Sequence, residues 1–193
     1  MDFKTGRLAN FKDVRWEPIY DTITLGTGAL TSSTNMFFAS PISATKTKND
    51  TNLVVAASLP SPQAFRCFGI HAEAFVTDVL DRNLLPKILM GSYIRFFVGT
   101  KDYAKVPFAR ICGGLNMEFD GADSKVGAAD VFEVAQFGKP AHFGYRFPKN
   151  YFVDIAATEN FGVEWVINIA SHTINTAVGI KMYLDGFRGV DVR

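Results

Sequence analysis

The sequence predicts a single all-β domain, a sandwich or barrel of about eight antiparallel strands with one short helix. Short stretches in which apolar and polar residues alternate recur along the chain, and Gly, Pro and polar turn residues separate them. The pattern contains no long amphipathic helix of the kind that connects parallel strands. The length of 193 residues fits one such domain, and no internal repeat or linker divides the sequence.

The clearest alternation runs through residues 66–77. It predicts a strand with Phe68 and Ile70 on one face and Cys67 and His71 on the other. Turn residues bound the other strands that the pattern predicts, which are residues 19–25, 35–40, 92–98, 102–106, 151–157, 161–169 and 179–184.

Four stretches differ from this pattern. Residues 78–90 carry apolar side chains at helical spacing, and Pro86 limits them to a short helix or turn. Residues 131–137 fit either a strand or a helix. Residues 1–17 are expected to form an arm that lies on a neighbouring subunit, or else a frayed first strand. Residues 185–193 are expected to form a tail.

Composition and charge exclude several classes of protein. The net charge of +1 argues against a grip on nucleic acid, which needs clustered Lys and Arg to displace counterions, so we expect no specific nucleic-acid partner. Cys67 and Cys112 are too few for a disulfide framework, so we interpret them as free thiols, although one bridge remains open. We find no signal-peptide pattern and no apolar stretch of bilayer length, and we expect a protein made in a cytoplasm.

The three histidines offer little chemistry. His71 shares the predicted strand face with Cys67 and Glu73, but Cys67 and His71 lie about 13 Å apart along a strand, too far to share a metal ion. A polar outer face is the simpler interpretation, and His142 and His172 fall in predicted loops. The sequence also lacks a His-x-His pair, a phosphate-binding glycine loop and an obvious acid pair. We therefore expect no catalytic, cofactor-binding or metal-binding residues, and a protein that is not an enzyme.

Three motifs, in order along the chain, carry a family resemblance. Residues 89–103 read LMGSYIRFFVGTKDY and lead to Pro107, residues 138–140 read GKP and precede an apolar strand pair that ends at Ile169, and residues 180–188 read IKMYLDGFR. In this order they resemble the jelly-roll coat proteins of tailless icosahedral bacterial viruses. In that family a strand ending in Gly-x-Lys-x-Tyr leads to a Pro, and the last strand ends in Leu-x-Gly and an Arg.

The resemblance implies a jelly-roll fold and a structural role. Such a subunit assembles itself into capsomers of a closed shell in the virion, where its partners are copies of itself and other capsid proteins, in some members over an internal lipid membrane. The chain is too short for two stacked jelly rolls, which favours a single-jelly-roll coat protein or a minor or vertex protein.

Five residues are candidates for contacts between subunits. Tyr93, Phe97 and Tyr183 would anchor an interface, unless a second sheet or a helix of the same chain covers them. Arg95 and Arg188 would pair across subunits, or else be solvated.

The alternative function is a carbohydrate-binding or host-attachment sandwich of a virion. In that case Tyr145, Phe147 and Tyr151 would stack on sugar rings.

Overall fold

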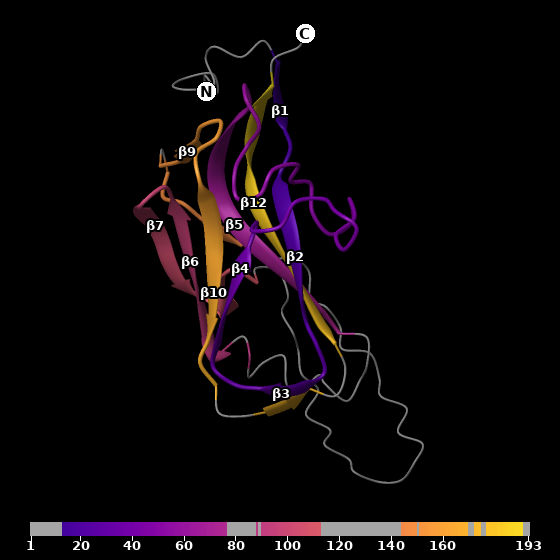
Figure 1. The fold of residues 1–193 in the computed structure, drawn as a ribbon. Helices are drawn as coiled ribbons and strands as arrows, with labels where there is room; N and C mark the ends of the chain where they lie inside the picture. The colour runs from indigo at the N-terminus through magenta and orange to yellow at the C-terminus, as the bar shows by residue number, and fades with distance from the viewer. Residues whose placement is uncertain are drawn as a thin grey trace, which may run out of the picture.

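The chain folds as a sandwich of two antiparallel sheets (Figure 1) in the computed structural model, which describes residues 13–76, 88, 90–112, 144–149, 151–169, 172–174 and 177–190. The first sheet contains β1 (Asp13–Trp16), β2 (Ile19–Leu25), β5 (Ala64–Val76), β8 (Tyr145–Arg146), β9 (Val153–Ile155) and β12 (Val178–Val190). The second sheet contains β4 (Ser33–Phe37), β6 (Ser92–Val98), β7 (Lys101–Pro107) and β10 (Phe161–Ile167). A small sheet of β3 (Gly28–Leu30) and β11 (His172–Ile174) lies across one end, and a 3-10 turn, η3 (Phe108–Arg110), follows β7.

The strand order is that of a jelly roll. The first sheet has the order β1–β12–β5–β8, with β2 also paired to β12 and β9 to β5, and the second has the order β4–β10–β6–β7. The chain crosses between the sheets from β2 to β4, from β4 to β5, from β5 to β6, from β7 to β8, from β9 to β10 and from β10 to β12. A chain that wraps around two sheets in this way defines a jelly roll. The predicted all-β jelly-roll sandwich is therefore confirmed.

The core lies between the inner faces of the two sheets. β6 shows the period of two directly, because its four inward side chains are buried and the three between them are half-exposed. Trp165 of β10 is fully buried at the centre, with its ring 6.2 Å from that of Phe37 and 5.0 Å from that of Phe108. Large rings therefore fill the space that the sheets enclose.

A β-bulge interrupts the long pairing between β5 and β12. The register shifts between Asp185 and Gly186, and Phe68 on β5 is the extra residue. Phe68 consequently turns to the outer face, where its ring packs edge-on against Phe187 at 5.3 Å, and Cys67 becomes fully buried.

The bulge corrects two expectations from the sequence. The prediction that Cys67 shares an outer face with His71 is wrong, because one extra residue reverses the alternation within the strand. The tail expected at residues 185–193 is also wrong up to Val190, since β12 continues past the bulge and pairs with both β5 and β1.

Other expectations lie partly or wholly outside the described residues. These are the helix at 78–90 apart from residues 88 and 90, the ambiguous stretch 131–137, the GKP motif at 138–140 and the first twelve residues of the arm. The remainder of the expected arm includes β1, which pairs with β12 of its own chain.

The buried carboxylate of Asp21 binds the segment after β4 to the first sheet through a hydrogen bond and an ion pair. Asp21 of β2 is fully buried, accepts a 2.7 Å hydrogen bond from the Phe38 backbone N–H and pairs with the Lys46 ammonium at 2.6 Å. Phe38 has a positive φ of 69°, which is unusual for a non-glycine residue. The hydrogen bond to Asp21 therefore stabilises a backbone conformation that Phe38 would otherwise rarely adopt.

We expect Gly186→Ala to destabilise the fold severely. A Cβ at this position would overlap the Arg66 carbonyl oxygen and lie 2.5 Å from Phe65 Cζ, inside the core. Overpacking of this kind costs about 3 kcal/mol of unfolding free energy or more. Urea denaturation measures the loss, with Gly26→Ala as the matched control because no atom lies within 4 Å of a Cβ there. Equal stability of the two variants would contradict the packing at the bulge.

The stability that Asp21 contributes to the fold should depend on pH. Burial raises the pKa of Asp21 above its ordinary value of 3.8, in spite of the opposing hydrogen bond from Lys46. The folded state then retains a proton at Asp21 that the unfolded state has lost, so the contribution of Asp21 to the unfolding free energy falls as the pH rises from 3.8 through the folded pKa.

The measurement compares the wild type with Asp21→Asn by urea denaturation from acid to neutral pH. The wild type should lose stability relative to the variant as the pH rises through this window, and the difference should be constant above it. A relative gain of stability with rising pH would contradict the assignment.

Candidate functional site

The interior of the sandwich is a packed core in which the described polar side chains have hydrogen-bond partners. Trp165 Nε1 donates a 3.0 Å hydrogen bond to Ser92 Oγ, which in turn donates to the Ile88 carbonyl at 2.6 Å. Within the described residues, every buried side-chain nitrogen and oxygen has a hydrogen-bond partner. In this part of the chain, therefore, no buried polar side chain is left over to receive a ligand.

Both cysteines are free and buried. Desolvation raises the pKa of Cys112 to about 12, and it raises the pKa of Cys67 further still. Because the thiolate is the reactive form, neither side chain has the character of a nucleophile or a redox centre.

Histidine and acidic side chains meet on the outer face of the first sheet. His71 Nδ1 lies 2.7 Å from Asp185 Oδ2, and the His71 ring stacks on Tyr183 with centroids 4.3 Å apart and 8° between the planes. The Tyr183 hydroxyl donates to Glu73 at 2.9 Å, and burial together with Glu73 raises the Tyr183 pKa.

These groups do not amount to a metal centre. Among the described residues, no three His, Cys, Asp or Glu side chains come close enough to hold a metal ion. His142 lies outside those residues, and His172 falls in β11 with its side chain undescribed.

Three of the five interface candidates lie together on the outer face of the second sheet. Tyr93, Arg95 and Phe97 project from β6, and all three are half-exposed. The Arg95 guanidinium pairs with Asp102 of β7 at 2.8 Å and with Glu164 of β10 at 2.9 Å, and these two carboxylates raise its pKa. The two ion pairs therefore link Arg95 of β6 to the strands on either side of it.

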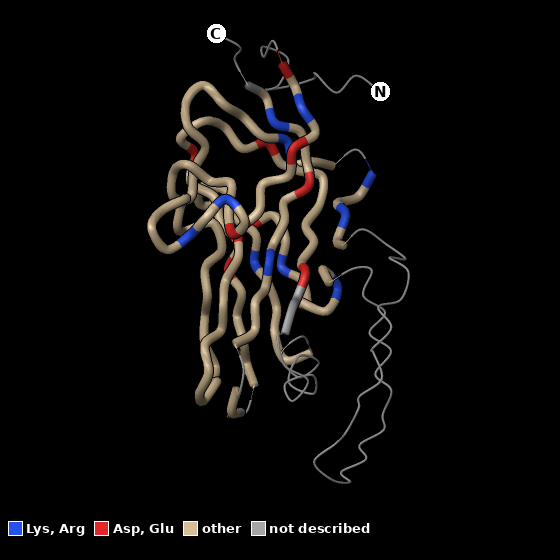
Figure 2. Tube along the Cα trace, turned by 90° about the vertical axis from the view of Figure 1, so that its right-hand side faces the viewer, with Lys and Arg blue, Asp and Glu red and all other residues tan. Residues whose placement is uncertain are grey.

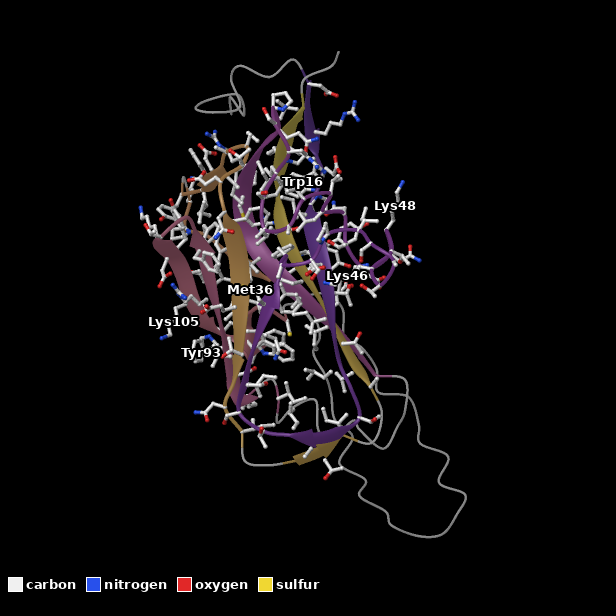
Figure 3. The ribbon with its side chains drawn as sticks, in the orientation of Figure 1. Trp16, Met36, Lys46, Lys48, Tyr93 and Lys105 are labelled. Atoms are coloured by element: carbon white, nitrogen blue, oxygen red, sulfur yellow. The ribbon has the colours of Figure 1, made fainter. Side chains whose placement is uncertain are left out.

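The rest of this outer face is largely apolar. The Phe97 ring lies over Gly162, since a Cβ there would meet Phe97 Cζ at 2.9 Å and Met36 Sδ at 3.1 Å. Lys105 lies with its ammonium 4.8 Å from the Tyr93 ring, and Figure 3 shows both side chains on the same side of the sheet. We call the outward residues of this sheet the second-sheet face: Thr34, Met36, Tyr93, Arg95, Phe97, Asp102, Lys105, Pro107, Gly162, Glu164 and Val166.

The other two interface candidates lie elsewhere. Tyr183 belongs to the outer face of the first sheet, in the cluster with His71 described above. Arg188 is 8% exposed near the end of β12, where it donates hydrogen bonds to Gln63 Oε1 at 3.0 Å and to Glu17 Oε1 at 2.9 Å. Arg188 is thus bonded within its own chain, and a role for either residue between subunits stays a prediction.

The three residues considered for sugar stacking pack against one another. Phe147 is buried, and its ring meets those of Tyr145 and Tyr151 edge-on, each at 5.8 Å. Tyr151 is the most exposed of the three at 44%. The rings of the trio are therefore largely engaged with one another, and only Tyr151 is well exposed.

An open polar cleft of about 460 Å³ lies between β2, β4 and the segment after β4, and no pattern in the sequence indicated it. Both charged groups in its lining have partners inside the chain, because Lys46 pairs with Asp21 and Asp50 accepts hydrogen bonds from Thr47. The lining residues are Thr22, Ile23, Thr24, Asn35, Met36, Ser40, Thr45, Lys46 and Asp50.

Sequence reasoning missed the partners that complete the second-sheet face. Glu164, Met36, Gly162 and Lys105 come from three strands, and their proximity to β6 depends on strand order. One signal was available, because Glu164 is the one charged residue in the apolar stretch 161–167 and its strand position points outward.

Charge is mixed over the molecule. In Figure 2 the Lys and Arg segments and the Asp and Glu segments are interspersed along the described chain. No helix in the described part of the chain is long and apolar enough to cross a membrane.

Comparison of the chain with protein-family models, with curated proteins and with solved structures finds no match.

The cysteine environments predict strong protection from thiol reagents. In the native protein at mildly alkaline pH, labelling of Cys67 and Cys112 should be no faster than unfolding, because burial keeps both groups protonated. Addition of denaturant without reductant should release two reactive thiols. Rapid labelling of the native protein would contradict the burial, and the absence of thiols in denaturant would reveal a disulfide.

Proposed function

We propose that this chain is a structural subunit of an icosahedral virus shell that assembles itself into capsomers. On this proposal the subunit is made in the host cytoplasm and resides in the virion, with copies of itself and other capsid proteins as partners. The observation that carries the proposal is a single jelly roll with a closed apolar core and an outer face of half-buried aromatic and ion-paired side chains. Fold alone does not define function, so the proposal rests on this combination.

Two of the three coat-protein motifs fall on strands of the sandwich. The motif at residues 89–103 contains β6 and the start of β7, including the Gly99 turn with a φ of 60° between them. The motif at residues 180–188 lies within β12, the strand that pairs with β1, β2 and β5. The resemblance therefore involves a hairpin of one sheet and a central strand of the other.

The edges and faces of the second sheet differ in a way that suits assembly. β7 is an edge strand that carries Lys101 and Lys105, a register shift and the terminal Pro107, which are features that oppose open-ended strand pairing. The adjoining face carries Tyr, Phe, Met and Arg, the residue types enriched in the centres of interfaces. This contrast favours association through faces over association through β7.

Enzymatic function and sugar binding have less support. The described residues offer no metal cluster, and burial raises the pKa of both cysteine thiols. The rings considered for sugar stacking are largely used in packing against one another. The structural role is the one that uses the aromatic and ion-paired outer face of the second sheet.

We expect the purified chain to form rings, capsomers or shell-like particles as its concentration rises. Light scattering and sedimentation velocity would follow the association, and electron microscopy would show the symmetry. A protein that remains strictly monomeric up to its solubility limit would overturn the proposal, and binding on a glycan array by such a monomer would favour the attachment function.

A further inference from the structure

We infer that two copies of this chain pack their second-sheet faces together around a two-fold axis that runs along the strands, between β6 and β10. This inference rests on the proposed function, because it names one contact through which the subunit would assemble. The register of the second sheet supports it, because that register fixes where each outward charge lies.

The strand register arranges the face in rows. One row runs across the four strands as Met36, Glu164, Arg95 and Lys105. An adjacent row contains Thr34, Val166 and Tyr93 on β4, β10 and β6. Each row crosses the sheet at right angles to the strands, with about 4.8 Å between neighbouring positions.

A two-fold axis along the strands exchanges the two sides of each row. It places β10 of one copy opposite β6 of the other, so that Glu164 faces Arg95 of the second copy and Arg95 faces its Glu164. In the adjacent row Val166 meets Tyr93 of the second copy. Sheets that pack face to face keep their strands within about 30° of each other, so residues close to the axis stay opposite one another.

The charges of the face are therefore complementary to the same face in a second copy. Arg95 and Lys105 balance Asp102 and Glu164, which leaves the face neutral. Each Arg95 already pairs with its own Glu164, and the axis would join two such pairs into a network of four alternating charges. The face carries no excess charge that would attract a strongly acidic or a strongly basic partner.

The size of the face sets the strength of the contact. Four strands with about six residues each span an area of about 20 by 20 Å, or about 400 Å² from each copy. The two copies together would bury about 800 Å², which is below the roughly 1,200 Å² at which standard specific interfaces begin, so the dimer should be weak and should depend on protein concentration. A weak contact is compatible with a shell in which each subunit makes several contacts.

The test exchanges charges across the axis. Arg95→Glu makes the centre of the face acidic and Glu164→Arg makes it basic, so each variant alone should associate about tenfold more weakly than the wild type, or worse. An equimolar mixture should recover association, because the acidic side chain introduced at position 95 of one variant would face the basic side chain introduced at position 164 of the other. Sedimentation equilibrium measures all three samples, and circular dichroism and thermal melting verify that each variant is folded.

A second pair of variants covers the case in which a central substitution prevents folding. Met36 is 38% exposed and would face Lys105 of the second copy. Met36→Lys should therefore weaken association more than Met36→Glu does. The cross-strand neighbour of Met36 within its own chain is Glu164, so the stability of the monomer should follow the opposite order.

Matched controls lie on the other sheet. Arg15→Glu and Asp13→Arg make the same two charge reversals within the Asp13–Arg15 ion pair of β1, and they should leave the association constant unchanged. Mixtures that fail to recover, or Met36 variants with the reverse order, would overturn the two-fold packing while self-assembly by the wild type keeps the proposed function. A wild type that never associates would overturn both.

Discussion

The long pairing of β5 with β12 is the interaction on which the rest of the sandwich depends. It runs from Val178 opposite Val76 to Gly189 opposite Ala64, and it forms the centre of the first sheet. β1 and β2 attach to one side of this pair and β8 and β9 to the other. Its bulge requires Gly186, because the Arg66 carbonyl and the Phe65 ring occupy the space of a side chain. A one-residue shift of this register would move the side chains of the shifted strand to the wrong face.

Both outer faces carry aromatic rings and charged groups, and each sheet pairs these groups in a different way. On the first sheet, Tyr183 and His71 stack and bond to acids within the chain. On the second sheet, Arg95 lies across three strands and is neutralised by two carboxylates beside the Phe97 ring. Surfaces built in this way are compatible with water, and under the proposed two-fold packing their charges would already have partners when a second copy approaches.

Much of the fold could be predicted because alternation reports burial locally. Residues 19–25 and 92–98 were predicted with the bounds of β2 and β6, and the jelly-roll order agrees with the resemblance. The bulge was not predictable, since it depends on where β12 places Gly186 opposite Cys67. The partners of Arg95 were not predictable either, because Asp102 and Glu164 lie 7 and 69 positions away in the sequence. Pairs of that kind are set by strand order, which no local pattern contains.

The inward positions of this sandwich constrain side-chain volume more than residue identity. A sandwich core requires apolar side chains of suitable volume at inward positions, and many combinations of Phe, Ile, Val and Leu satisfy it. Inward positions can therefore vary widely while the strand order persists. Under the proposed two-fold packing, one Glu and one Arg in the outward rows, on neighbouring strands, would decide which surfaces attract. For this chain the outer faces, more than the core, should carry the information that defines its partners.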